Sequence, residues 1–271
     1  MFVLLTAKAS DMDCPHCQSK NTRLCQAKTD LGYKQYRCRF CRKQYNERTS
    51  TSLNYIQYPT EVVMLAVHYY YQFRNSLDDV VELMEMRGFH LSHQTVHNWS
   101  HTFGVELGLK LREKRYGQAG KKWHTDATYI RVEGRWCYSY RAIDKEGNLV
   151  DVYLSDVRDQ AAAEAFFQQA KNATGITPTQ ITTDKEPALY PAVNHRDSKY
   201  MNNRLESDHR VTKSRLSIMK GFKNIFCALI FCTVFEEVRQ FFRMKNKTRA
   251  ERCSVLASRI QDFRKITLLA A

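Results

Sequence analysis

The chain has 271 residues, which is enough for one domain of ordinary size and one or two small ones. Lys and Arg number 42 against 28 for Asp and Glu, so the formal net charge is +14. This excess favours a polyanionic partner such as DNA, because each neutralised phosphate releases condensed counterions; a basic protein without such a partner is the alternative. The apolar runs are too short for a secretion signal or a membrane-spanning helix, so we expect a soluble cytoplasmic protein.

Residues 12–48 contain two cysteine pairs, CPHC at 14–17 and CRFC at 38–41, separated by 20 residues. This spacing suits a tetrahedral structural zinc ion held by two turns, and a chance occurrence of two such pairs is the alternative. The segment has too few apolar residues for a core of its own, so bound Zn²⁺ would supply the free energy of folding. The predicted zinc ligands are Cys14, Cys17, Cys38 and Cys41, with His16 and Cys25 as spare candidates.

Residues 58–116 predict three consecutive helices. Ser76 stands as an N-cap with Asp79 three residues later, and Ser92 is the expected N-cap of the third helix. The short turn at Gly88 between the last two helices is typical of a helix-turn-helix. We therefore predict a helical DNA-binding domain, with a plain three-helix bundle as the alternative.

In a helix-turn-helix, the exposed start of the last helix contacts base edges. The predicted DNA-binding residues are His93, Gln94, His97 and Asn98, whereas Val96 and Trp99 are expected to pack inward. After this helix, GQAGKK at 117–122 is interpreted as a flexible basic linker at a domain boundary.

Residues 121–243 predict the main domain, a mixed α/β (α+β) fold. Aromatic and β-branched runs predict antiparallel strands at 123–132, 135–143 and 149–155. Asp159 and Gly175 are the expected caps of a helix, and QITTD after it predicts a fourth, parallel strand.

The rest of the chain is predicted to be helical. IFCALIFCTVFEEVRQFFRM has the apolar face of a long helix that covers the sheet. The basic tail at 244–271 predicts an amphipathic helix that faces solvent, or else contacts DNA or a second subunit.

Two aspartates of this domain are candidate metal ligands. Asp126 lies on the first strand and Asp184 ends the fourth, which this topology would place beside the first. Such carboxylates repel one another, so they are either solvated at a sheet end or neutralised by a divalent cation. The following helix offers Glu206 or Asp208 as a third carboxylate, and Lys213 shares a helix face with Glu206.

The segments WHTDATYIRVEGRW, YRAIDKEGNLVDVYLS, ITTDKEPALYPAV and HRDSKYMNNRLESDHR resemble the core of the bacterial IS6-type insertion sequence transposases, members of the DDE superfamily. The resemblance covers residues 123–243. It implies an RNase H-like catalytic core in which Asp126, Asp184 and Glu206 hold Mg²⁺ (or Mn²⁺), with Lys213 as a basic catalytic residue. It also implies a nucleoid-associated, homo-oligomeric transposase that binds insertion-sequence ends, cleaves them and transfers the strands to target DNA.

One departure from that family concerns the segment between the second and third carboxylates. Only residues 185–205, 21 in number, separate Asp184 from Glu206, whereas similar transposases usually carry a longer segment there. Reach is not the obstacle, because 22 residue steps can span on the order of 70 Å. The short segment supports an alternative function, that of a catalytically inactive, internally deleted transposase-derived protein that still binds DNA.

Overall fold

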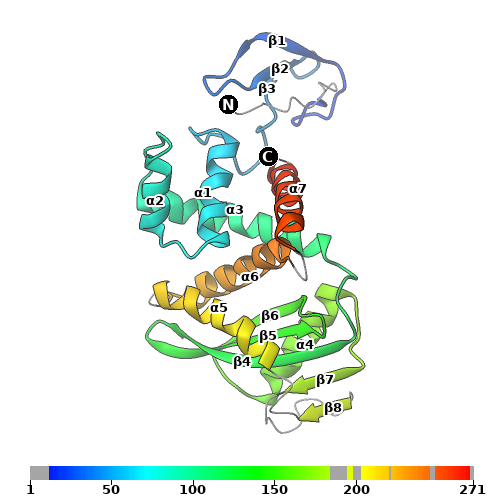
Figure 1. Ribbon diagram of the computed structural model, residues 1–271. Helices are drawn as coiled ribbons and strands as arrows, with labels where there is room; N and C mark the ends of the chain where they lie inside the picture. The colour runs from blue at the N-terminus through cyan, green and yellow to red at the C-terminus, as the bar shows by residue number, and fades with distance from the viewer. Residues whose placement is uncertain (1–11, 184–193, 198–202, 220, 245–247, 269–271) are drawn as a thin grey trace. The chain divides into compact units, whose positions relative to one another are not determined.

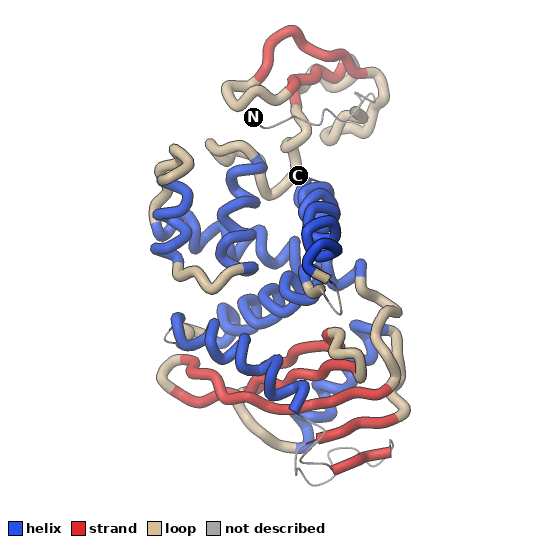
Figure 2. Tube along the Cα trace, in the orientation of Figure 1, coloured by secondary structure: helices blue, strands red, loops and turns tan. Residues whose placement is uncertain are grey.

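The computed structural model describes residues 12–183, 194–197, 203–219, 221–244 and 248–268. The chain divides into two compact units, residues 1–64 with 267–271, and residues 65–266. Figure 2 distinguishes the helices, strands and loops along the chain. Among the described residues, no helix has the length and apolar character needed to cross a membrane.

The first unit contains a small antiparallel sheet. Its strands, in the order β1-β2-β3, are β1 (Thr22–Lys28), β2 (Lys34–Cys38) and β3 (Gln44–Tyr45). The rings of Tyr36 and Tyr45 stack with centroids 5.7 Å apart, and a hydrophobic cluster of this unit has only Cys14, Cys38 and Tyr45 as fully buried members. A cluster this small buries little apolar surface, which is consistent with the expectation that a bound metal ion would supply the free energy of folding.

Three helices follow: α1 (Thr60–Gln72), α2 (Leu77–Glu85) and α3 (His93–Lys114). The predicted caps are confirmed. The Ser76 hydroxyl accepts from the Asp79 amide at 3.1 Å, and the Asp79 carboxylate accepts from the Ser76 amide at 2.7 Å. Ser92 accepts from the Thr95 amide at the start of α3.

The second unit is built around a five-stranded mixed sheet. Its strands are β4 (Lys122–Val132), β5 (Arg135–Asp144), β6 (Leu149–Ser155), β7 (Gln180–Thr183) and β8 (Asn194–Asp197). The order is β6-β5-β4-β7-β8; β4, β5 and β6 are antiparallel neighbours, and β7 and β8 add in parallel (Figure 1). This is the strand arrangement of an RNase H-like core, and it confirms the four predicted strands.

Strand β8 was not predicted. Its sequence, NHRD, has neither the alternation nor the β-branched residues that indicate a strand. It becomes a strand because it pairs in parallel with β7, from Gln180 opposite Asn194 to Thr183 opposite Asp197. The short segment between Asp184 and Glu206 therefore contributes an edge strand to the sheet.

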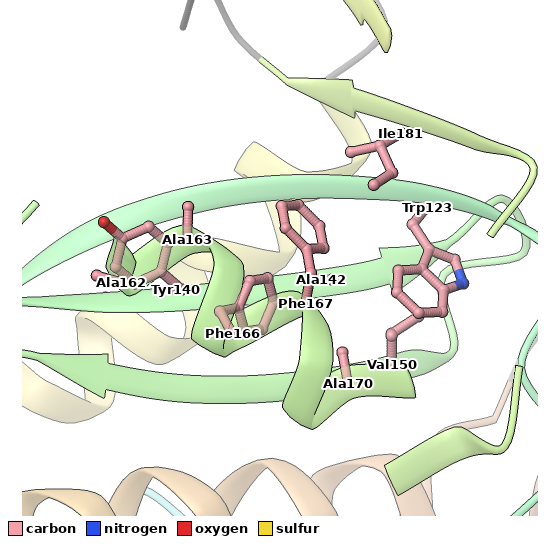
Figure 3. Close-up of a cluster of buried hydrophobic side chains, with 10 residues drawn as sticks. All are labelled: Trp123, Tyr140, Ala142, Val150, Ala162, Ala163, Phe166, Phe167, Ala170 and Ile181. Atoms are coloured by element: carbon pink, nitrogen blue, oxygen red, sulfur yellow. The ribbon is translucent and has the colours of Figure 1, made fainter. Parts of the chain in front are cut away.

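One face of the sheet is covered by α4 (Gln160–Thr174), whose caps Asp159 and Gly175 are those predicted. Figure 3 shows the aromatic rings of α4 packed against side chains from β4, β5 and β7. The ten fully buried members of this core are Trp123, Tyr140, Ala142, Val150, Ala162, Ala163, Phe166, Phe167, Ala170 and Ile181. Because side chains alternate along a strand, the neighbours of Trp123 on β4 point to the other face.

That other face carries α5 (Asn203–Met219) and α6 (Ile225–Phe242). Arg141 of β5, whose neighbours Tyr140 and Ala142 belong to the α4 core, forms a 2.9 Å ion pair with Glu236 of α6. The predicted helix over the sheet is thereby confirmed.

The last turn of α3 is fixed to the same unit by buried charges. The Arg115 guanidinium forms two 2.7 Å hydrogen bonds with the carboxylate of Glu237 on α6, and Arg112 pairs with Asp151 of β6 at 2.6 Å. Burial raises the pKa of the Glu237 carboxyl, and the bidentate bond to Arg115 opposes that shift. The segment at 117–122, which was interpreted as a flexible linker, is also hydrogen-bonded to the sheet. Its Gly120 amide donates to the Asp144 carboxylate of β5 at 2.9 Å.

The C-terminal helix α7 (Arg249–Leu268) packs an aromatic ring beside a half-buried histidine. The imidazole of His68 lies 4.8 Å from the ring centre of Phe263 and 5.1 Å from that of Phe242. Burial lowers the pKa of His68 to about 4, so the ring is neutral in the folded protein at neutral pH.

This histidine should make the second unit sensitive to acid. The unfolded chain protonates His68 below about pH 6.5, whereas the folded chain does so only near pH 4, so stability is complete above pH 6.5 and falls as the pH decreases toward 4. Between pH 7 and pH 5 the loss is about 2 kcal/mol. We expect His68→Phe to reduce the difference in Tm between these pH values in thermal unfolding. An unchanged difference in His68→Phe would contradict this prediction.

Candidate active site and nucleic-acid interface

Asp126 lies on the central strand β4, half-buried, opposite Arg141 of β5. Its Oδ1 atom accepts a hydrogen bond from the Ala127 amide at 2.7 Å. On the other side of β4, the pairing with β7 ends where Thr182 lies opposite His124, two residues before Asp126. The carboxylate therefore lies on the face of α5 and α6, just beyond the point where the neighbouring parallel strand ends.

Of the other two predicted carboxylates, the structure describes only the backbone position of Glu206. Asp184 lies outside the described residues; the residue before it, Thr183, is the last of β7. Glu206 belongs to α5, which contacts β4 and lies across the sheet (Figure 1), but its side chain is outside the described part of the structure. Lys213 follows on the same helix and is exposed. The structure thus brings the strand of Asp126 and the helix of Glu206 together.

Helix α5 is anchored by two side chains that the sequence analysis missed. The Thr212 hydroxyl donates to Oε1 of Glu236 at 2.7 Å. Arg215 is fully buried, donates to the Tyr70 carbonyl at 3.0 Å, and lies 4.9 and 5.1 Å from the ring centres of Tyr70 and Phe231. Cation–π contacts of a desolvated arginine contribute on the order of 2 kcal/mol. Arg215 lies in a polar stretch of the sequence, and no local pattern there indicates that its side chain is buried.

The four predicted cysteines form one cluster. Their Sγ atoms all lie within 4.8 Å of one another, with Cys14–Cys41 at 3.6 Å and Cys17–Cys38 at 3.5 Å. Tetrahedral coordination with Zn–S bonds of about 2.3 Å requires sulfur–sulfur distances of about 3.8 Å, so the donor set fits. The cluster could hold a metal ion, and the spare candidates His16 and Cys25 are not part of it.

The local backbone turns after each cysteine pair and donates hydrogen bonds to one of the sulfurs. The residue after each pair, Gln18 and Arg42, has a left-handed φ of 57° and 60°, which turns the chain back past the sulfurs. Burial alone would raise the pKa of the Cys38 thiol, but the amides of Cys41 and Phe40 donate to it and lower the pKa to about 6. The Ser19 amide opposes the shift at Cys17, but burial and the three neighbouring thiols raise the pKa of that thiol to about 12. Of these two thiols, Cys38 is therefore the one favoured as a thiolate, the form that binds zinc.

The start of α3 presents most of the predicted DNA-binding side chains to solvent. His93, Gln94 and Asn98 are exposed and His97 is half-buried, whereas Val96 and Trp99 are buried as predicted. The Gln94 amide donates to the Asn98 side chain at 2.7 Å.

Acidic residues of α2 lie beside this surface. The Nε2 atom of His93 is 4.0 Å from a carboxylate oxygen of Asp78, and Glu82 and Glu85 line the same shallow pocket. Phosphate would be repelled there, so the Gln94 and Asn98 side offers the more favourable approach for DNA.

Comparison with known proteins gives the family. A family model described as a DDE domain matches residues 120–245. The chain is 34% identical over 185 residues to the transposase for the insertion sequence-like element IS431mec of Staphylococcus aureus, covering 63% of this chain and 82% of the relative. The transposase for IS257 in transposon Tn4003 of the same species matches with equal identity and coverage.

Solved structures give weaker matches. The integrase catalytic core domain of HTLV-2, in complex with magnesium, has a TM-score of 0.36 and 15% identity, covering 51% of this chain and 98% of that domain. The simian T-cell lymphotropic virus intasome in complex with PP2A regulatory subunit B56 gamma has a TM-score of 0.38 and 12% identity, covering 69% of this chain and 70% of that one. The RNase H-like assignment therefore depends on the strand order.

An RNase H-like sheet within a matched DDE domain defines a class, the DDE-type phosphoryl-transfer enzymes. Within that class, the chain belongs to the family of IS6-type insertion sequence transposases, together with those of IS431mec and IS257.

Proposed function

We propose that this transposase binds the ends of its own insertion sequence, cleaves the strands there and joins them to target DNA, as a homo-oligomer. The observation that carries the proposal is the position of Asp126 within the matched DDE domain: a half-buried carboxylate on the central strand, on the face crossed by α5. The net charge of +14 supports a DNA partner.

The proposed catalytic residues are Asp126, Asp184, Glu206 and Lys213. The parallel register supports the pairing of the two aspartates, because Thr182 lies opposite His124 and each aspartate comes two residues later in its own chain segment. The contact between α5 and β4 supports Glu206 as the third ligand. Carboxylate oxygens are ligands suited to Mg²⁺, with Mn²⁺ as a substitute.

Two such ions, when bound, activate an attacking oxygen and stabilise the leaving oxygen of an in-line displacement at phosphorus. The three carboxylates would hold the ions, and the exposed ammonium of Lys213 would bind a phosphate of the substrate. Water as the nucleophile gives a nick, and a 3′-hydroxyl gives strand transfer. Neither reaction needs a nucleotide cofactor.

Recognition of DNA is proposed for the two N-terminal elements. His93, Gln94, His97 and Asn98 would contact base edges from α3. The four-cysteine ribbon, with structural Zn²⁺, would contact the phosphate backbone through its many basic residues.

A second candidate function is that of an internally deleted, inactive transposase that only binds DNA. Residues 184–193, ten in number, are all that connect the parallel strands β7 and β8. A parallel crossover usually requires about a dozen residues or more, so this connection is short for the fold.

Strand cleavage decides between the two functions. We expect the zinc-loaded protein with Mg²⁺ or Mn²⁺ to nick or join a duplex that carries the inverted repeat flanking its gene, as measured by denaturing gel electrophoresis. A shuffled duplex of equal length is the control. Binding without cleavage in either metal would refute the enzymatic function and leave DNA binding. Equal cleavage of both duplexes would instead indicate a general RNase H-like nuclease.

A further inference from the structure

Glu236 connects the two elements that carry the proposed active site. It lies on α6 and its side chain is 2% exposed. Its Oε1 accepts from the Thr212 hydroxyl of α5 at 2.7 Å. Its Oε2 pairs with Arg141 of β5 at 2.9 Å and with Arg239 of α6 at 3.3 Å.

The partners of Glu236 lie close to the proposed catalytic residues, one across the sheet and the other along α5. Arg141 is the residue of β5 directly opposite Asp126. Thr212 is adjacent to Lys213 and lies six residues, or about 9 Å of helix, from Glu206. One buried carboxylate therefore joins the strand beside Asp126 to the helix of Glu206.

Stability alone is a weak reason for such an arrangement. Desolvating an ion pair costs several kcal/mol per charge, and well-packed apolar residues are often as stabilising. The buried carboxylate instead fixes the relative position of two elements, because one of its oxygens binds α5 and the other binds β5. Arg215, three residues after Thr212, holds the same helix against Tyr70 and Phe231. The C-terminal half of α5 is thereby fixed at two neighbouring points.

We propose that Glu236, acting through Thr212 and Arg141, is a positioning residue that sets the distance between Glu206 and Asp126. The inference rests on the proposed function, because it assumes that these two carboxylates bind the same metal ions. A displacement of about 1 Å at a reacting centre costs on the order of 100-fold in rate. Loosening α5 at Thr212 should therefore slow catalysis by a larger factor than an equally destabilising substitution elsewhere in the fold.

The test uses Thr212→Val, which removes the hydroxyl donor and keeps the volume. Its strand cleavage rate should fall about 10- to 100-fold, and its affinity for Mn²⁺, measured by titration calorimetry on the zinc-loaded protein, should fall severalfold. Thr212→Ser, which restores the hydroxyl, should recover both properties.

Thr174→Val is the matched control. Thr174 is fully buried in α4, and its hydroxyl donates to the Ala170 carbonyl at 2.8 Å, remote in sequence from both carboxylates. It should lower the Tm about as much as Thr212→Val and leave cleavage and Mn²⁺ affinity unchanged.

Equal losses of cleavage and Mn²⁺ affinity in the two valine variants would overturn the proposal, as would unchanged values in Thr212→Val. If the unmutated protein binds Mn²⁺ and DNA but never cleaves, the proposed enzymatic function fails separately. The Mn²⁺ affinities of the variants still decide the role of Glu236 in that case. An unmutated protein that binds no Mn²⁺ would overturn both.

Discussion

Asp126→Asn is expected to reduce strand cleavage about a thousandfold or more while leaving the affinity for the element-end duplex unchanged. Asparagine keeps the size of the side chain and an oxygen that can accept from the Ala127 amide, so the local backbone of β4 should be preserved. It removes the negative charge that would hold the divalent ions. Loss of about 4 kcal/mol of transition-state stabilisation corresponds to this factor.

The measurement is single-turnover cleavage in Mg²⁺, with duplex affinity determined in parallel. Asp156→Asn is the control, because Asp156 is an exposed carboxylate just after β6 in the same unit. Cleavage by Asp126→Asn at the unmutated rate would exclude this aspartate from the site. A parallel loss in both variants would point to general damage to the fold.

The double substitution Cys14→Ser with Cys38→Ser should abolish zinc binding and unfold residues 12–48. These two cysteines are almost fully buried and provide, with Tyr45, the buried members of the ribbon's cluster. Structural zinc supplies about 10 to 16 kcal/mol of apparent binding free energy in small metal domains, far more than this cluster could contribute by apolar burial. Zinc per chain is measured by plasma mass spectrometry, and unfolding by limited proteolysis.

Cys25→Ser is the matched control for zinc. Cys25 lies on β1 in the same ribbon, but it is not a member of the four-cysteine cluster. It should retain one zinc ion per chain and resist protease. Unchanged zinc content in the double variant would exclude the cysteine site, whereas zinc loss in Cys25→Ser would indicate a different ligand set.

Features that depend on neighbouring residues were predictable. The N-caps Ser76, Ser92 and Asp159 and the left-handed Gly175 each act within a few residues of their own helix. Strands β4, β5 and β6 are rich in aromatic and β-branched residues and are joined by short turns, so their pairing needs little information from elsewhere in the chain.

Features that depend on partners far away in the sequence could not be predicted. Strand β8 has no strand pattern of its own and exists through its pairing with β7. Arg215 occurs in a polar stretch, yet its partner Tyr70 is 145 residues away. The charge pair of Arg115 and Glu237 spans 122 residues.

The sequence by itself determined which chemical groups this protein has: four cysteines at metal-binding spacing, an aspartate on the first strand of a predicted meander, and caps that begin and end the helices. Spacing and periodicity encode these features locally. Only the tertiary structure decided that Glu236 binds both the strand opposite Asp126 and the helix of Glu206. Burial of a charged side chain depends on every element packed around it, and a local sequence pattern contains no information about that packing.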